Sequence, residues 1–193
     1  MKLTTRPLTP DLWPAFEDLF GKSGASNGCW CMYWRIGSAY RQAAPGEDRY
    51  QRNRAAFKAV VKRGPPPGLL AFDGVVAVGW CQLTPRGALP WLERRATRTW
   101  KAGAAPAWAI SCFYIRKGYR RQGVTVALIE AALDLARKAG APALEAYPLD
   151  ARETTSTSFT GYASTFARAG FKTVGRPSPA RPIMRHDLKT IGR

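Results

Sequence analysis

Two amphipathic helices are predicted in the N-terminal third of the chain. The first begins after Thr9-Pro10-Asp11, a typical helix start, and its apolar positions recur every three or four residues up to Gly21. Residues 47–63 show helical spacing with a weaker apolar face, and the RGPPPG segment ends this helix because proline cannot continue it. The apolar positions of the first helix are Leu12, Trp13, Phe16, Leu19 and Phe20.

A β-hairpin is predicted after the second helix. Residues 69–72 and 75–83 are largely apolar, and the Asp73-Gly74 pair between them favours the backbone geometry of tight hairpin turns. Residues 85–106 are rich in Arg, Pro, Gly and Ala, and we expect them to form a long mobile insertion. Since we find no internal repeat and no linker, we expect residues 1–193 to form one domain.

The second half of the chain alternates strands and helices. Residues 107–115 form an apolar strand, a helix with one apolar face runs from near Gly123 to Gly140, and residues 143–147 form another strand. This order indicates a mixed α/β sheet that is flanked by helices. The remaining predicted elements are a helix over residues 158–169 and strands over residues 172–174 and 183–188.

The charge of the chain indicates an anionic partner. Lys and Arg number 30 and Asp and Glu 13, which gives a formal net charge of +17 at pH 7. A phosphate-rich cofactor, a nucleic acid or an acidic membrane surface would each satisfy this excess. The N-terminus lacks the apolar core of a signal peptide and no apolar run is long enough to span a membrane, so we expect a cytoplasmic protein. Cys29 and Cys31 are too close for an ordinary disulfide framework, which fits a reducing compartment.

The turn between the strand over 107–115 and the following helix concentrates positive charge. It contains Arg120 and Arg121, and Gly123 lets the backbone approach a ligand without a Cβ atom in the way. A strand, a glycine-containing turn and a helix N-terminus aim several backbone N–H groups at one point, where the helix dipole adds positive potential. The turn therefore indicates a phosphate or pyrophosphate site, and an ordinary basic turn is the alternative.

Two motifs in this half of the chain are similar to those of a known protein family. Arg120-Arg121-Gln122-Gly123-Val124-Thr125 opens one helix, and Phe166-Ala167-Arg168-Ala169-Gly170-Phe171 ends the next. The segment from Ala107 to Phe171 resembles the core of the GNAT superfamily of acyl-CoA-dependent N-acyltransferases, whose signature is Arg/Gln-x-x-Gly-x-Gly/Ala at a helix start. Thr125 stands where the family usually has glycine or alanine. The resemblance implies a mostly antiparallel central sheet whose parallel fourth and fifth strands splay apart to admit acetyl-CoA.

The resemblance also implies how acetyl-CoA is held. By position, backbone groups at the end of the fourth strand bind the pantetheine arm of coenzyme A, and the N–H groups of residues 121–125 hold its pyrophosphate. The cofactor-binding residues expected in this way are Phe113, Tyr114, Ile115, Arg120, Arg121, Gln122, Gly123, Val124 and Thr125.

The candidate catalytic residues depart from the family pattern. Many members have a tyrosine that protonates the departing thiolate, and this chain has Phe166 at that place. Tyr162, which we expect one helical turn earlier on the same face, is the candidate acid. Glu145 and Ser111, on the fifth and fourth strands, are the candidate bases, and solvent or a purely structural ion pair of Glu145 are the alternatives.

The aromatic CWCMYWR segment, residues 29–35, has two interpretations. Because the resemblance places this segment beside the acceptor, Trp30, Tyr33 and Trp34 are candidates to line the acceptor pocket, and Arg35 is a candidate to pair with an acceptor carboxylate or phosphate. Alternatively, the aromatic rings cap the core. One C-x-C pair and a distant histidine fall short of a four-ligand zinc site, so we expect no metal.

Three functions are consistent with the sequence. The first is an N-acetyltransferase, a monomer or homodimer, in which an amine of a small molecule or protein directly attacks acetyl-CoA. The second is a basic module that binds RNA or the ribosome through its charge and aromatic rings. The third is a catalytically silent regulator that binds acyl-CoA, suggested by Phe166. We expect the first.

Overall fold

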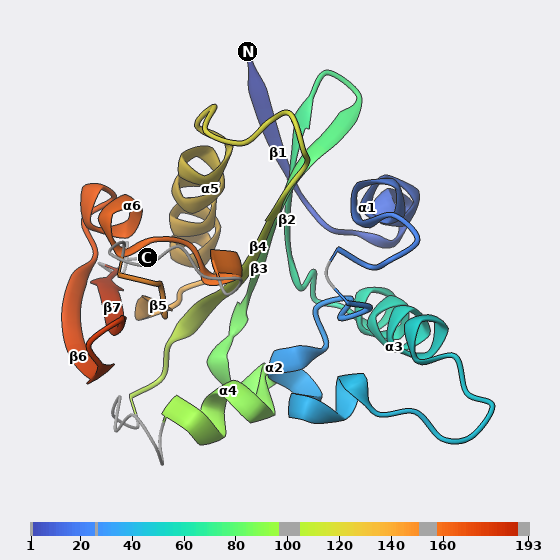
Figure 1. The fold of residues 1–193 in the computed structure, drawn as a ribbon. Helices are drawn as coiled ribbons and strands as arrows, with labels where there is room; N and C mark the ends of the chain where they lie inside the picture. Colours follow the sequence, from blue (N-terminus) through green and yellow to red (C-terminus); the bar gives the residue numbers. More distant parts are fainter. Residues whose placement is uncertain (1, 26, 97–104, 151–157, 189–193) are drawn as a thin grey trace.

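The computed structural model describes residues 2–25, 27–96, 105–150 and 158–188, which build one seven-stranded sheet (Figure 1). The strand order is β1-β2-β3-β4-β5-β7-β6; β4 and β5 are parallel and the other neighbouring pairs are antiparallel. The predicted mixed sheet is therefore confirmed. The strands are β1 (Leu3–Pro7), β2 (Gly68–Asp73), β3 (Val76–Pro85), β4 (Trp108–Ile115), β5 (Ala143–Ala146), β6 (Lys172–Ser178) and β7 (Arg181–Asp187).

Helices cover both faces of the sheet. α5 and α6 lie on one side, and α1 and α3 lie on the other (Figure 1). None of the described helices is long and apolar enough to cross a membrane. The α-helices are α1 (Trp13–Phe20), α2 (Tyr33–Ile36), α3 (Arg49–Arg63), α4 (Pro90–Arg94), α5 (Val124–Lys138) and α6 (Ala163–Arg168), and the short 3₁₀ helices are η1 (Pro10–Leu12), η2 (Gly37–Arg41), η3 (Arg86–Ala88) and η5 (Ser158–Thr160).

Two large apolar cores among the described residues hold these layers together, one on each face of the sheet, and a smaller third core joins α2 and α4 to β4 and β7. The α5 side buries the aliphatic stripe of that helix, including Leu128 and Ile129, against β2, β3 and β4. The α1 and α3 side is built from aromatic rings around the fully buried Trp80, which meets Phe16 and Phe57 edge-on with ring centroids 4.9 and 6.0 Å apart. Because β3 is covered on both faces, it is buried almost throughout, as expected of a central strand. These cores fix the position of the neighbouring strand β4.

The segment expected as a mobile insertion over residues 85–106 begins with packed structure. After β3 the chain forms η3 and α4, and Leu89 is fully buried. Arg86 is 3% exposed and pairs with the buried carboxylate of Glu145. The described part of this segment therefore differs from the expected loop, because its apolar side chains and its arginine pack against the sheet. Residues 97–104 lie outside the described residues.

The helix expected over residues 158–169 is interrupted. Gly161, with a φ of 78°, separates η5 from α6, which begins at Ala163. Tyr162 is the N-cap of α6 and has an extended backbone, with φ −110° and ψ 140°. The prediction that Tyr162 lies one helical turn before Phe166 on the same helix face is therefore wrong, because a left-handed glycine ends the first turn.

Candidate active site

The parallel strands β4 and β5 separate beyond Ile110. Their pairing begins at Trp108 and Leu144 and ends at Ile110 and Ala146, whereas β4 itself continues to Ile115. The backbone of the C-terminal half of β4 is therefore outside the ladder with β5. The prediction of two splayed parallel strands is confirmed.

A β-bulge marks the point where β4 leaves β5. Gln82 of β3 pairs with Cys112 but Leu83 pairs with Ile110, so Ser111 is the extra residue. The Ser111 hydroxyl donates to Gln82 Oε1 (2.8 Å), and its carbonyl accepts a hydrogen bond from Trp34 Nε1 (2.9 Å). Ser111 is 1% exposed, and the structure places it outside the cavity described next. Its hydroxyl is therefore engaged in holding the bulge.

A cavity of about 1520 Å³ opens where β4 and β5 separate. Pockets for one small molecule typically measure about 300–1,000 Å³, so this cavity has room for more than one ligand group. The loop before α5 forms one part of its wall, and α2, η2 and the start of β7 form another. Gln122 is the one expected cofactor-binding residue that does not line it. The others do, namely Phe113, Tyr114, Ile115, Arg120, Arg121, Gly123, Val124 and Thr125.

The loop before α5 has the backbone geometry of an anion site. Gly118, Arg121 and Gly123 have φ values of 95°, 62° and 82°, and the Gln122 side chain donates to the Gly118 carbonyl (2.6 Å) and braces the turn. Successive N–H groups in such a loop form a concave nest for anions, and the N-terminus of the fifteen-residue helix α5 adds its dipole. A Cβ added at Gly123 would meet no protein atom within 4 Å, so space is open in front of this backbone. These features fit a diphosphate.

Glu145, a candidate base, is enclosed by three hydrogen-bond donors. It is fully buried and accepts from Arg86 Nη1 (2.8 Å), Tyr147 OH (2.7 Å) and Arg185 Nη1 (3.0 Å). Although burial alone would lower the pKa of Arg86, its hydrogen bonds to Glu93 and Glu145 raise it above the ordinary value. Glu145 does not line the cavity. It joins β5 to β7 and to the η3–α4 segment, as a structural ion pair does.

Tyr147 lines the cavity and was not anticipated from the sequence. Burial, followed by the charge of Glu145, raises the pKa of its phenol well above the ordinary value. Since its hydroxyl donates to Glu145, Tyr147 stays neutral and its proton is engaged.

The position that the family usually gives to tyrosine faces the core in this chain. Phe166 is fully buried, and its ring lies 6.0 Å from that of Phe113 and 5.1 Å from that of Phe171. His186 packs on Phe171 with ring centroids 5.4 Å apart, which indicates a packing role for that histidine. Tyr162 lines the cavity, so the structure brings this candidate acid together with the expected cofactor-binding residues.

The CWCMYWR segment divides between core and cavity. Trp30 is 3% exposed and stacks on rings of α1, so it belongs to the core. Arg35 donates to the carbonyl of Ala88 (2.9 Å) and does not line the cavity. Tyr33 and Trp34 line it. Trp30 therefore fits the core interpretation, and the acceptor role of Tyr33 and Trp34 stays a prediction.

The cysteines of this segment are poor nucleophiles. Burial raises the pKa of Cys29 to about 12 and raises that of Cys31 well above its ordinary value, so both thiols stay protonated at neutral pH. Cys31 Sγ also accepts a hydrogen bond from Trp80 Nε1 (3.1 Å). Among the residues that the structure describes, no three His, Cys, Asp or Glu side chains are grouped as metal ligands.

Several cavity residues have no signal in the sequence. Arg41 and Tyr40 come from η2, Thr160 from η5 and Arg181 from the start of β7. They meet only because η2, η5 and β7 are brought together by the fold, and neither spacing nor a motif connects them.

Comparison with known proteins agrees with this geometry. The model of the acetyltransferase (GNAT) family matches residues 29–159, more than half of the chain. Comparison with curated protein sequences gives no significant match.

Solved structures share the fold along nearly the whole chain. A mosquito arylalkylamine N-acetyltransferase like 5b is 11% identical, with a TM-score of 0.60 over 97% of this chain and 100% of that one. A Corynebacterium glutamicum structure titled histone acetyltransferase HPA2 and related acetyltransferase is 19% identical, with a TM-score of 0.58 over 97% of each chain. The PaiA N-acetyltransferase of Thermoplasma acidophilum, in complex with coenzyme A, is 14% identical, with a TM-score of 0.53 over 97% of this chain and 100% of that one. With the match of the family model, the chain belongs to the GNAT family of acetyltransferases.

Proposed function

We propose that the protein is an N-acetyltransferase that moves the acetyl group of acetyl-CoA to a primary amine of a small molecule or a protein. The observation that carries this proposal is the continuity of the cavity. It runs from the anion nest before α5, past the gap between β4 and β5, to an aromatic wall formed by Tyr33, Trp34, Tyr40 and Phe159. Acetyl-CoA supplies the acetyl group as a thioester: the amine nitrogen bonds to the acetyl carbon, the carbon–sulfur bond breaks, the nitrogen loses a proton and the sulfur gains one.

The cofactor half of the cavity suits coenzyme A in charge and in shape. The N–H groups of residues 121–125 would hold the diphosphate, and Arg120 and Arg121 would balance its charge. The end of β4, which is free of β5, offers backbone groups to the two amides of the pantetheine arm. The parting of the strands would thus position the thioester between them.

Direct attack by the amine is supported by what the cavity lacks. Cys29 and Cys31 are protonated thiols at neutral pH, and the Ser111 hydroxyl, outside the cavity, is engaged by Gln82. Cys112 also lines the cavity, but a thiol is activated by a neighbouring base, and the described lining residues supply no His, Asp or Glu to act as one. Among the described residues that line the cavity, no Asp, Glu or His is present to act as a base. We therefore expect solvent to take the proton of the amine.

We assign the proton donor for the departing sulfur to Tyr162, a cavity residue with a hydroxyl that can donate. Tyr162→Phe is expected to lower kcat by about 100-fold, the scale of one general acid, and to leave coenzyme A binding unchanged. Tyr50→Phe is the matched control, because its hydroxyl accepts from Arg49 on α3 and does not line the cavity. Equal rates for both variants would remove Tyr162 from this role.

Binding of coenzyme A tests the proposal as a whole. Calorimetric titration should show heat for the wild type and none for the Arg120→Ala, Gly123→Trp double variant, which loses a charge and fills the open space before the nest. Arg137→Ala, a change of a half-buried side chain on α5 away from the cavity, is the control. A wild type without heat or thermal shift would contradict the proposal. Thiol release from acetyl-CoA across a panel of amines then separates an enzyme from a silent acyl-CoA-binding regulator.

A further inference from the structure

The cavity keeps a strong positive charge beyond the anion nest. Arg41, Arg95 and Arg181 also line it, and within the described part of the chain no Asp or Glu does. These arginines do not belong to the loop before α5. The segments around α2 and α4 lie at the opposite end of the sheet from that loop (Figure 1), so the charge extends to the part of the cavity that would take the acceptor.

Two of these arginines are held in place by their neighbours. Arg41 donates from Nε to Tyr40 OH (2.7 Å) and lies over the Tyr40 ring at 5.2 Å. Arg181 donates from Nη1 to Thr160 Oγ1 (2.8 Å). Burial lowers the pKa of Arg181 while the nearby Tyr33 opposes this, which indicates a guanidinium that is partly withdrawn from water and close to the aromatic wall. A guanidinium fixed in this way loses little freedom when it binds an anion.

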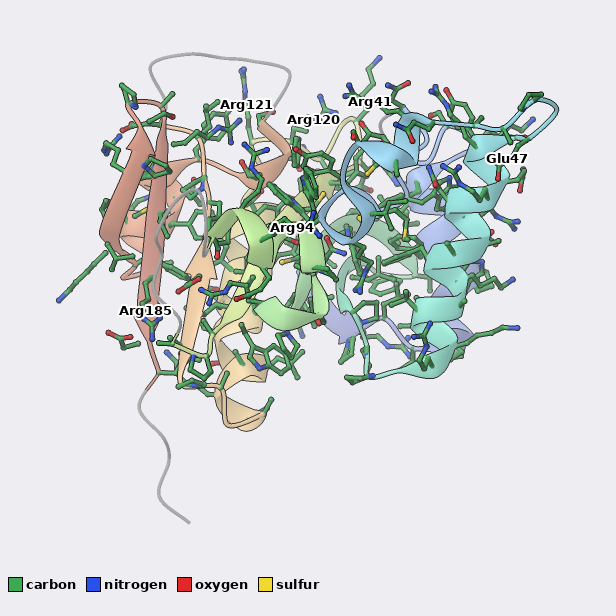
Figure 2. The ribbon with its side chains drawn as sticks, turned by 90° about the horizontal axis from the view of Figure 1, so that it is seen from below. Arg41, Glu47, Arg94, Arg120, Arg121 and Arg185 are labelled. Carbon is green, nitrogen blue, oxygen red and sulfur yellow. The ribbon has the colours of Figure 1, made fainter. Side chains whose placement is uncertain are left out.

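The aromatic rings connect the two arginines. Tyr40 meets Tyr33 edge-on with centroids 5.8 Å apart, and Tyr33 meets Phe159 edge-on at 6.4 Å. Phe159 directly precedes the Thr160 that holds Arg181. Figure 2 shows Arg41 on the same side of the molecule as Arg120 and Arg121. The rings of Tyr33, Tyr40 and Phe159 line the same cavity as the loop before α5.

We propose that the acceptor is a primary amine that also carries an anionic group, a carboxylate or a phosphate, which Arg181 and Arg41 bind. The inference rests on the proposed acetyl transfer. A guanidinium matches both anions with two parallel hydrogen bonds, and the rings between the arginines would pack on an apolar body of the acceptor. A polycationic amine is expected to bind less well, because the arginines that line the cavity repel it.

Matched pairs of amines test this class. Tryptophan and tryptamine differ by a carboxylate, phosphoethanolamine and ethanolamine differ by a phosphate, and spermidine represents the polycations. Thiol release at saturating acetyl-CoA should give a kcat/KM about tenfold or more higher for the anionic member of at least one pair, since hydrogen bonds to charged groups are of this strength. The two pairs distinguish carboxylate from phosphate.

Variants of the arginines identify the anion site. Arg181→Gln should reduce the ratio within the preferred pair about tenfold and leave the KM for acetyl-CoA unchanged, and Arg181→Lys should retain part of the ratio because the charge remains. Arg137→Gln, outside the cavity, should change neither. A thermal shift with coenzyme A checks that each variant folds, and Arg41→Gln replaces Arg181→Gln if the latter does not.

The outcomes separate this inference from the proposed function. If neither tryptophan nor phosphoethanolamine reacts faster than its partner without the anionic group, or if spermidine reacts as fast as the better of these two, the acceptor class is overturned while acetyl transfer stands. The same follows if Arg181→Gln and Arg41→Gln both keep the wild-type ratio. If coenzyme A fails to bind, or no amine releases thiol, the proposed function fails and the acceptor class falls with it.

Discussion

Replacing Glu145 by glutamine decides whether this buried carboxylate acts as a base or holds the sheet together. Its Oε2 accepts from Arg86 and Tyr147, and its Oε1 accepts from Arg185. Glutamine keeps the shape but turns one oxygen into an NH₂ donor. Whichever way the amide is oriented, that donor faces an arginine donor, so at least one of the three hydrogen bonds is lost along with the charge.

The expected loss in the free energy of unfolding depends on which ion pairs the two arginines keep. Removing one partner of a buried ion pair costs about 3–5 kcal/mol. Arg86 keeps Glu93 (2.7 Å), and Arg185, whose side chain is 20% exposed, keeps Asp187 (2.7 Å). The cost should therefore lie near the lower end, at about 3 kcal/mol. For a chain of this size each kcal/mol lowers Tm by about 2–4 °C, so the expected shift is about 6–12 °C.

Thermal unfolding and acetyl transfer, measured on the same samples, give the answer. Glu93→Gln is the control: the Glu93 side chain is 34% exposed and Arg86 keeps Glu145, so the loss should cost about 1.5 kcal/mol, the lower end for a hydrogen bond to a charged group. Below its Tm, Glu145→Gln should transfer acetyl groups at a rate within about tenfold of the wild type, whereas loss of a general base costs about 100- to 10,000-fold. An unchanged Tm with a rate loss of that size would refute the structural role and restore Glu145 as the base.

Two further predictions concern the thiols and the nest. Burial raises the pKa of Cys29 from 9.0 to about 12 and raises the pKa values of Cys31 and Cys81. As the pH rises above 9, these thiols lose their protons in the unfolded chain before they do so in the folded protein. The stability that these thiols contribute below pH 9 is therefore lost as the pH rises. The loss is about 1.4 kcal/mol per thiol, or about 4 kcal/mol in all, between pH 8 and pH 10, and a flat Tm over this range would contradict it. Gly123→Ala should cost only about 1–2 kcal/mol in chemical denaturation, because its φ of 82° is unfavourable to alanine while the added methyl meets no protein atom within 4 Å. In calorimetry it should weaken coenzyme A binding, which an unaltered affinity would disprove.

Most of the fold could be predicted because its elements have strong local patterns. The hairpin at Asp73-Gly74 and the helix between Gly123 and Gly140 are both present. β1, Leu3–Pro7, was missed: its polar threonines and arginine give no apolar run, and only its pairing with β2 makes it a strand. The split of residues 158–169 depends on one left-handed glycine inside a pattern that is otherwise helical.

The candidate site was predictable only where a motif marks it. The loop before α5 carries its glycine and arginines in sequence, and it lines the cavity. The CWCMYWR segment contains no such motif. Trp30 and Cys31 have left-handed φ values of 45° and 58°, so the periodicity of a helix or a strand does not predict which way their side chains point. Arg41 and Arg181 line the same cavity although they are far apart in the sequence, and only the folded sheet brings them together.

The backbone turn at Gly161 determines which side chains of this segment face the core and which face the cavity. A Cβ at Gly161 would lie 3.0 Å from the ring of Phe166 and 3.2 Å from that of Phe113, so this turn packs against the core while Tyr162, the next residue, lines the cavity. A tyrosine at position 166 would place its hydroxyl in that core, where an unpaired hydroxyl costs about 1–3 kcal/mol. The exchange Tyr162→Phe with Phe166→Tyr should therefore lower Tm and leave kcat as low as in Tyr162→Phe alone. Recovery of wild-type kcat in the exchanged protein would contradict this reasoning. It would show that a tyrosine at position 166 reaches the sulfur and that Tyr162 has only a packing role.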